Sequence, residues 1–125
     1  MDFGCGTGRT AELLSKVGYT NITGNDGSED MVAISKAKGI YKNVFKFFVG
    51  KDDITEHAEA NSFDMVTCTG CLVRDHFPSS CFDDFLKVLK PHGLLAVTAR
   101  TKVLHTETDN GMGYVPKIKQ LIEDG

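Results

Sequence analysis

The chain has 125 residues, of which 41% are hydrophobic and 25% are charged, and its formal net charge is −3. A chain of this length forms one domain and buries about two thirds of the surface that its unfolded form exposes. Because 17 acidic residues outnumber 14 basic ones and no basic run occurs, the composition argues against a nucleic acid or an anionic membrane as partner.

Cellular location is predicted from three further features. The longest aliphatic stretch, residues 94–97, is far shorter than the ~20 residues of a membrane-spanning helix. The first residues show neither a basic leader nor an apolar signal core, and the four cysteines are too few and too irregularly spaced for a disulfide framework. We therefore expect reduced thiols, no membrane association and an intracellular, cytoplasmic location.

The first part of the chain predicts the order strand, helix, strand, helix. Residues 1–3 are a short strand that runs into a glycine-rich turn, and apolar residues then recur at helical spacing over 9–17. Residues 21–25 form a weak strand. Ser28 is a good N-cap, and the acidic residues after it suit the first turn of a helix that ends near Gly39.

The rest of the chain continues this alternation. The expected elements are strands over 44–49, 63–68 and 94–99 and helices over 79–90 and 116–123. The segment between the first two of these strands is polar and irregular. Strands that alternate with helices and are apolar on both faces predict an α/β fold with a doubly wound, mainly parallel sheet and helices on both faces.

The glycine-rich turn, Gly4-Cys5-Gly6-Thr7-Gly8, lies where a strand leads into a helix, which is where an open parallel sheet binds its ligand. Glycine allows a sharp turn there and lets a ligand lie against the main chain. Asp26 follows at the end of the next strand, in a position from which a carboxylate accepts both hydroxyls of an adenosine ribose. The turn and the acid together predict a nucleoside-containing cofactor.

The glycine spacing distinguishes between two such cofactors. Turns that bind dinucleotides have the pattern G-x-G-x-x-G, whereas the third glycine here is Gly8 and position 9 is Arg. Asp2 also lies two residues before the first glycine, where a carboxylate would repel a pyrophosphate and suit the ammonium group of a methionine moiety. This favours S-adenosylmethionine over NAD.

Residues 2–8 resemble motif I of the class I S-adenosylmethionine-dependent methyltransferases, which have a Rossmann-like fold. The likeness continues through segments 26–31, 63–66 and 89–95, where His92 stands in place of a glycine of the family's Leu-Lys-Pro-Gly-Gly turn. Within that family, segments 26–28, 39–41 and 98–101 are most similar to the Williams–Beuren-region methyltransferase-like proteins.

The resemblance implies a role for several residues in binding the cofactor. The glycines would form the turn under the methionine and ribose, Asp2 would hold the methionine end, and Asp26 would bind the ribose hydroxyls. Met31 would pack near the adenine, and Thr69 would lie beside the methyl donor. The family's adenine-contacting acid is displaced here to Asp52 or Asp53. The full set of predicted cofactor-binding residues is Asp2, Gly4, Gly6, Gly8, Asp26, Gly27, Met31, Asp52 and Thr69.

Both ends of the sequence depart from the family pattern. Only residues 1–3 represent the first strand, and the antiparallel strand pair that closes the family's sheet does not follow the last helix. We therefore expect a fragment, truncated at both ends: a single, partial methyltransferase domain that covers the cofactor half of a larger enzyme and has low stability alone.

Methyl transfer from a sulfonium is an in-line displacement in which the protein mainly aligns the reactants, so no catalytic side chain is assigned. The segment after the fourth strand lacks the motifs of enzymes that methylate base or glutamine amino groups or cytosine C5, which favours a small-molecule or protein acceptor. Two alternatives remain: a non-catalytic S-adenosylmethionine-binding module and an NAD-dependent oxidoreductase. Cys68 and Cys71 have C-x-x-C spacing, but without a second such pair we expect no metal site.

Overall fold

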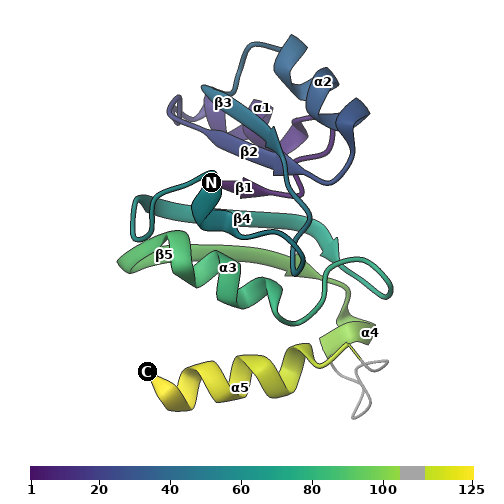
Figure 1. The fold of residues 1–125 in the computed structure, drawn as a ribbon, viewed down its shortest axis with the longest axis vertical. Coiled ribbons are helices and arrows are strands. Elements are labelled where there is room, and N and C mark those ends of the chain that lie inside the picture. The colour runs from purple at the N-terminus through teal and green to yellow at the C-terminus, as the bar shows by residue number, and fades with distance from the viewer. Residues whose placement is uncertain (105–111) are drawn as a thin grey trace.

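The computed structural model describes residues 1–104 and 112–125, and its strands form one parallel sheet in the order β3-β2-β1-β4-β5 (Figure 1). The strands are β1 (Asp2–Phe3), β2 (Thr23–Asp26), β3 (Asn43–Lys46), β4 (Phe63–Leu72) and β5 (Leu89–Ala99). The central strand, β1, pairs with β2 on one side and with β4 on the other. The doubly wound, parallel α/β fold predicted from the sequence is confirmed.

Helices connect consecutive strands and follow the last one. They are α1 (Arg9–Lys16), α2 (Glu29–Ala37), the short 3₁₀ helix η1 (Ile54–Glu56), α3 (Cys81–Val88), α4 (Thr101–Leu104) and α5 (Tyr114–Asp124). Each predicted helix is present within about two residues of its expected bounds. Sequence analysis missed η1, whose cap is the Asp53 side chain accepting from the backbone N–H of Thr55 at 3.0 Å.

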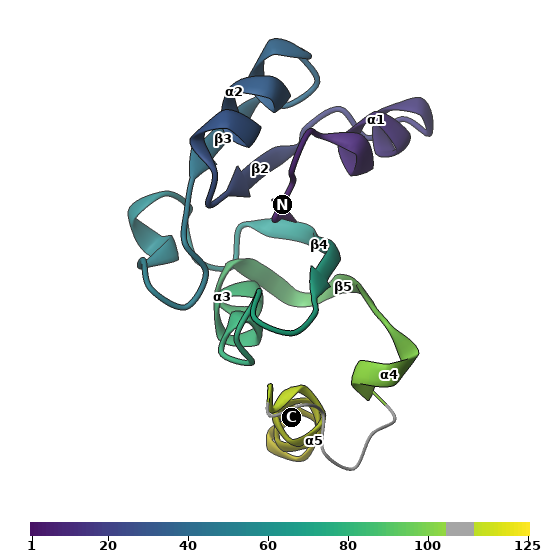
Figure 2. The ribbon, with the colours of Figure 1, turned by 90° about the vertical axis from the view of Figure 1, so that its right-hand side faces the viewer.

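The strand order fixes where the helices lie. Because crossovers between parallel strands are right-handed, the connections that run from β1 to β3 cover one face, and those that return through β4 to β5 cover the other. Figure 2 shows α1 and α3 on opposite sides of the sheet. The main core lies on the α3 side, where Phe3 of β1 packs against Phe47 and Phe85 and where Tyr114 of α5 is buried beside Phe82.

Strand β4 extends beyond its predicted end, and this corrects the expectation that residues 69–72 form a loop. Gly70 adopts a φ of +76° and donates its N–H to Thr98 Oγ1 at 3.0 Å, and Leu72 pairs with Ala99 of β5. The register is irregular between Cys68 and Leu72. The left-handed glycine therefore lets the strand bend and pair again, which short-range apolar patterning does not predict.

The predicted turn at residues 91–93 is retained as an irregularity inside β5. Between the pairs Phe63 with Leu89 and Met65 with Leu94, β4 advances two residues while β5 advances five. His92 has a φ of +64°, a left-handed conformation that usually favours glycine. His92 thus adopts the backbone conformation expected of the glycine that it replaces in the family pattern.

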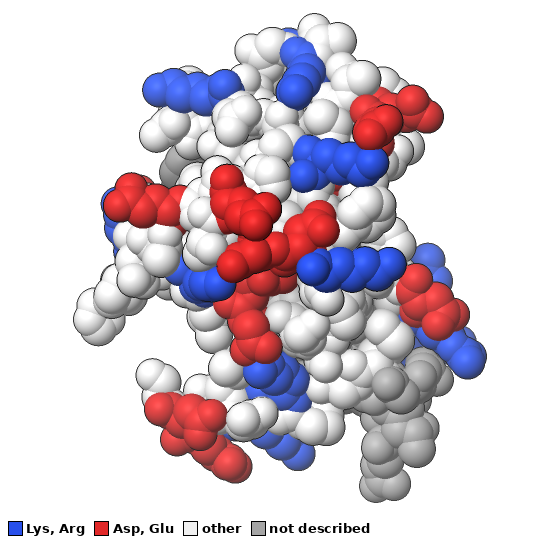
Figure 3. Space-filling model, viewed as in Figure 1, with Lys and Arg blue, Asp and Glu red and all other residues white. Residues whose placement is uncertain are grey.

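The surface carries interspersed charges of both signs. Acidic side chains gather near the middle of the face drawn in Figure 3, with basic side chains around them. In the described part of the chain, five lysines form ion pairs of 2.6–3.0 Å with acidic residues: Lys38 with Glu12, Lys46 with Glu29, Lys87 with Asp53, Lys90 with Asp64 and Lys117 with Asp83. None of the helices in the described ranges combines the length and apolarity needed to cross a bilayer.

We expect Phe85→Ala to lower the free energy of unfolding by about 3–5 kcal/mol, because it leaves a cavity among Phe3, Phe77 and Phe82. Phe85 has no exposed surface, whereas the neighbouring Leu86 of α3 is 41% exposed. Leu86→Ala is therefore the matched control and should cost less than about 1 kcal/mol. Urea unfolding followed by circular dichroism measures both; equal losses would show that this cluster is not the core.

Candidate functional site

The glycine turn (residues 4–8) lies at the carboxyl end of β1 and leads directly into α1. Its three glycines, Gly4, Gly6 and Gly8, have φ values of +63°, +52° and +87°, which residues with a Cβ rarely adopt. The turn is held against β2 by Asn25, whose carbonyl oxygen accepts from the N–H of Cys5 at 2.8 Å. The turn thus occupies the edge of the sheet where doubly wound folds bind ligands.

The three glycines have different surroundings. A Cβ on Gly4 would collide with Cys71 Sγ, and a Cβ on Gly8 would lie 3.1 Å from the ring of Tyr41. A Cβ on Gly6 would meet no atom within 4 Å. At Gly4 and Gly8 the missing side chain therefore lets other residues of the protein pack against the turn. At Gly6 the turn is open and available to a ligand.

Asp26 lies at the end of β2 with its carboxylate against this open side. Its Oδ2 accepts from the N–H of Gly6 and its Oδ1 from the N–H of Ser28, both at 2.9 Å. A carboxylate has about four acceptor positions, so each oxygen keeps capacity for one further donor. The structure therefore joins the predicted acid to the predicted turn through a direct hydrogen bond.

Asp2 is brought beneath the same turn, where it is almost fully buried. Its Oδ2 accepts from Tyr41 Oη at 2.7 Å and its Oδ1 from Thr67 Oγ1 at 2.8 Å. Burial raises the pKa of Asp2, although these two hydrogen bonds oppose the shift. Both carboxylate oxygens are thus held by protein groups, and the predicted contact of Asp2 with a methionine amine stays a prediction.

Thr69 lies on β4 beside the start of α1. Its hydroxyl and that of Thr10 are 2.7 Å apart, and both residues lie toward the surface. Cys68 and Cys71 flank it and are buried, free thiols. Within the described residues no group of three or more His, Cys, Asp or Glu side chains is placed to hold a metal ion.

Three of the predicted cofactor-binding residues, Gly27, Met31 and Asp52, lie around the start of α2. The ring of Phe48 would lie 3.0 Å from a Cβ on Gly27, and Asp52 Oδ2 accepts from the N–H of Phe48 at 2.7 Å. Met31, which is 36% exposed, is in the first turn of α2, capped by Ser28. Phe48 thus links Gly27 to Asp52, while their contact with a ligand remains a prediction.

Sequence analysis missed three residues that support the turn. Asn25 is fully buried, Ser35 Oγ donates to Met31 O at 2.6 Å and lies 3.2 Å from Gly6 O, and Tyr41 contacts Gly8 and Asp2. A polar residue in a strand, as Asn25 is, is a signal that could have been noticed. Ser35 and Tyr41 reach the turn from residues that are distant in sequence, so local patterning does not reveal them.

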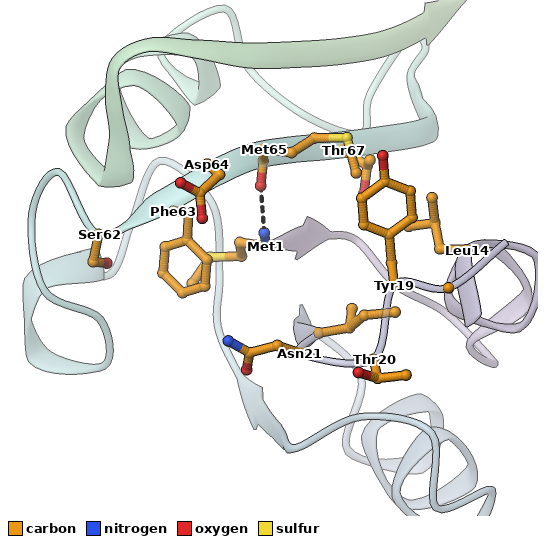
Figure 4. A pocket seen from close by; sticks show the side chains of 12 residues that line it. Met1, Leu14, Tyr19, Thr20, Asn21, Ser62, Phe63, Asp64, Met65 and Thr67 are labelled. Atoms are coloured by element: carbon orange, nitrogen blue, oxygen red, sulfur yellow. Dashed lines mark hydrogen bonds between the residues drawn. The ribbon is translucent and has the colours of Figure 1, made fainter.

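A cavity lies away from this turn. It has a volume of about 380 Å³ and is lined by the amino ends of β1 and β4 and by the segment after α1, including Met1, Tyr19 and Met65 (Figure 4). The amino group of Met1 donates to Met65 O at 2.6 Å beside it, and burial lowers its pKa to about 6. The cavity and the glycine turn are therefore at opposite edges of the sheet.

Comparison with known proteins identifies the family. A protein-family model for a methyltransferase domain matches residues 1–97. The chain belongs to this methyltransferase family. The resemblance to class I methyltransferases that motif I indicates is confirmed, and a nicotinamide-dependent family is not the one matched.

Individual relatives agree with this assignment. Human methyltransferase-like protein 27 is 32% identical over 101 residues, which are 81% of this chain and 40% of that protein. Solved structures that match include a SAM-dependent methyltransferase from Thermotoga maritima (28% identical, TM-score 0.59, 77% of this chain and 41% of that one). Another is the [4+2]-cyclase SpnF, which is 31% identical with a TM-score of 0.60, over 77% of this chain and 36% of that one. The chain spans about 40% of the length of the curated relatives it matches.

We expect Gly4→Ala to destabilise the methyltransferase domain more than Gly6→Ala. Both substitutions place a Cβ in the left-handed region, which costs about 1–2 kcal/mol, but only the methyl group added at position 4 would also collide with Cys71 and Phe77. Urea unfolding measures the difference. In a Cys71→Ala background the cost of Gly4→Ala should fall; an unchanged cost would show that this contact does not require the glycine.

The pKa of Asp2 predicts a pH dependence of stability. Because burial raises its pKa in the folded state above the ordinary value of 3.8, the native chain loses stability as pH rises from that value through the folded-state pKa. Asp2→Asn removes this ionisation and keeps polar groups for Tyr41 and Thr67. We expect the free energy of unfolding of this variant, relative to the native chain, to increase as pH rises above 3.8. A pH-independent difference would contradict the shift.

Proposed function

We propose that this chain binds S-adenosylmethionine at the glycine turn and forms the cofactor-binding part of an enzyme that transfers a methyl group from it. The observation that carries the proposal is the combination of an open backbone at Gly6 with the Asp26 carboxylate fixed to its N–H. Family membership, and the similarity to the SAM-dependent methyltransferase of Thermotoga maritima, support the identity of the cofactor.

The proposed contacts follow from the placement of each group. The ribose hydroxyls would donate to the free acceptor positions of Asp26, and the methionine and ribose would lie along Gly4, Gly6 and Gly8. Gly27 and Met31 would adjoin the adenine at the start of α2, with Asp52 as its polar contact. Thr69, beside Thr10, would lie near the methyl donor.

The cofactor, when bound, supplies an activated methyl group on a sulfonium. The chain's part in the reaction would be to hold the donor so that an acceptor approaches in line, since alignment of the reactants supplies most of the acceleration in such a displacement. A general base would be needed only for an acceptor that must lose its proton early. We propose a small molecule or a protein as the acceptor, and an intracellular location, which suits the four free cysteines.

A second candidate is a domain that binds the cofactor without transferring its methyl group. One comparison favours it, because a structure 31% identical to this chain is described as a [4+2]-cyclase rather than as a methyltransferase. The two candidates share the cofactor site and differ in turnover. Product formation from radiolabelled S-adenosylmethionine with a panel of acceptors, in a protein that includes the parts found in longer relatives, separates them.

We expect Asp26→Ala to weaken binding of S-adenosylhomocysteine by about 1–3 kcal/mol, the typical value of hydrogen bonds to a charged group. Asp30→Ala is the matched control, because Asp30 is an exposed acid in the first turn of α2 and should leave the affinity unchanged. Isothermal titration calorimetry measures both, with NAD as the competing ligand class. Binding of NAD alone, or equal affinities of the Asp26→Ala and native chains, would refute the proposed site.

A further inference from the structure

A tyrosine outside the glycine turn packs against both the turn and the strand that precedes it. Tyr41 is in the connection between α2 and β3 and belongs to neither element. Its side chain extends across the α1–α2 side of the sheet to the carboxylate of Asp2 in β1, and its Oη donates to Asp2 Oδ2 at 2.7 Å. Thr67 of β4 donates to the other oxygen at 2.8 Å, so one carboxylate links β1, β4 and the connection between α2 and β3.

The ring of Tyr41 fills the space between two glycine backbones. A Cβ on Gly24 of β2 would lie 2.7 Å from Cε1 of this ring, and a Cβ on Gly8 would lie 3.1 Å from Cε2. These two atoms are on opposite edges of the ring. The width of the ring therefore lies between β2 and the last glycine of the turn.

The hydroxyl prevents the ring from moving along this space. Burial and the neighbouring Asp2 charge raise the pKa of Tyr41, so the phenol stays protonated and remains a donor. Asp2 in turn is held by Thr67 from the opposite side. The ring is thus fixed at its tip by the central strand and at its two edges by Gly8 and Gly24.

We propose that Tyr41 is a positioning residue for the cofactor: through Gly8 and Asp2 it sets the position of the glycine turn without touching the cofactor itself. The inference rests on the proposed function for its consequence in binding, but the fixed position of the turn can be measured without any ligand. Ordinary core packing would predict only that loss of the ring destabilises the whole domain, whereas positioning predicts a local loss at residues 4–8.

Hydrogen exchange of the ligand-free chain tests the first part. In Tyr41→Leu we expect the amides of residues 4–8 to exchange at least tenfold faster than in the native chain, while the amides of α3 change by no more than the loss in global stability requires. Tyr41→Phe keeps the ring but removes the hydrogen bond to Asp2, so the exchange at residues 4–8 should lie between those of the native chain and Tyr41→Leu. Tyr19→Ala, which removes a tyrosine that is 54% exposed, is the control. Uniform acceleration, or none at residues 4–8, would overturn the proposal.

A double-mutant cycle tests the second part by measuring the Kd of S-adenosylhomocysteine. Gly24→Ala should push the ring toward Gly8 and weaken binding at least tenfold, and Tyr41→Leu should also weaken it. In the double variant the effects should not add, because the new methyl group at position 24 no longer meets the ring. Additive losses would overturn positioning by the ring. If the native chain binds no S-adenosylhomocysteine, the proposed function fails, and hydrogen exchange alone decides on Tyr41.

Discussion

The buried carboxylate of Asp2 is the interaction on which the centre of this domain depends. It lies in a two-residue strand at the middle of a five-stranded sheet, where the backbone offers few hydrogen bonds to hold it. Burying a carboxylate is costly unless its oxygens find donors. Tyr41 and Thr67 provide them from the two sides of the strand, so the same group that would be unfavourable in isolation joins β1 to β4 and to the α2–β3 connection.

The side chains packed against the glycine turn explain why it has one free side. Cys71 and Phe77 fill the space that a Cβ on Gly4 would need, and Tyr41, whose hydroxyl is held by Asp2, fills the space that a Cβ on Gly8 would need. Only Gly6 faces open space, and there the N–H of Gly6 is directed at Asp26. The pattern of three glycines therefore combines two packing requirements with one position free for a ligand.

How much of the fold and of the site could be predicted from the sequence depends on how far apart along the chain the interacting residues lie. Ser28 as N-cap and the acids after it identify α2, because capping is local, and the turn and Asp26 are separated by a single crossover. The structural roles of Asp2 and Tyr41 were not predicted, because the partners of Asp2 lie 39 and 65 residues away along the chain. The extension of β4 past Cys68 was missed for a similar reason, since it depends on pairing with β5.

The amino and carboxyl ends of the strands show why the site is better recognised by backbone geometry than by cavity volume. The cavity of about 380 Å³ is at the amino ends of β1 and β4, where strands of a parallel sheet begin. At the carboxyl ends, the turn leads into a helix and lies against a carboxylate with free acceptor positions, which backbone N–H groups of Gly6 and Ser28 hold in place. A ligand gains affinity from such preorganised groups because they need little reordering when it binds. The carboxyl edge is therefore chemically the stronger site, although the cavity of about 380 Å³ lies at the opposite edge.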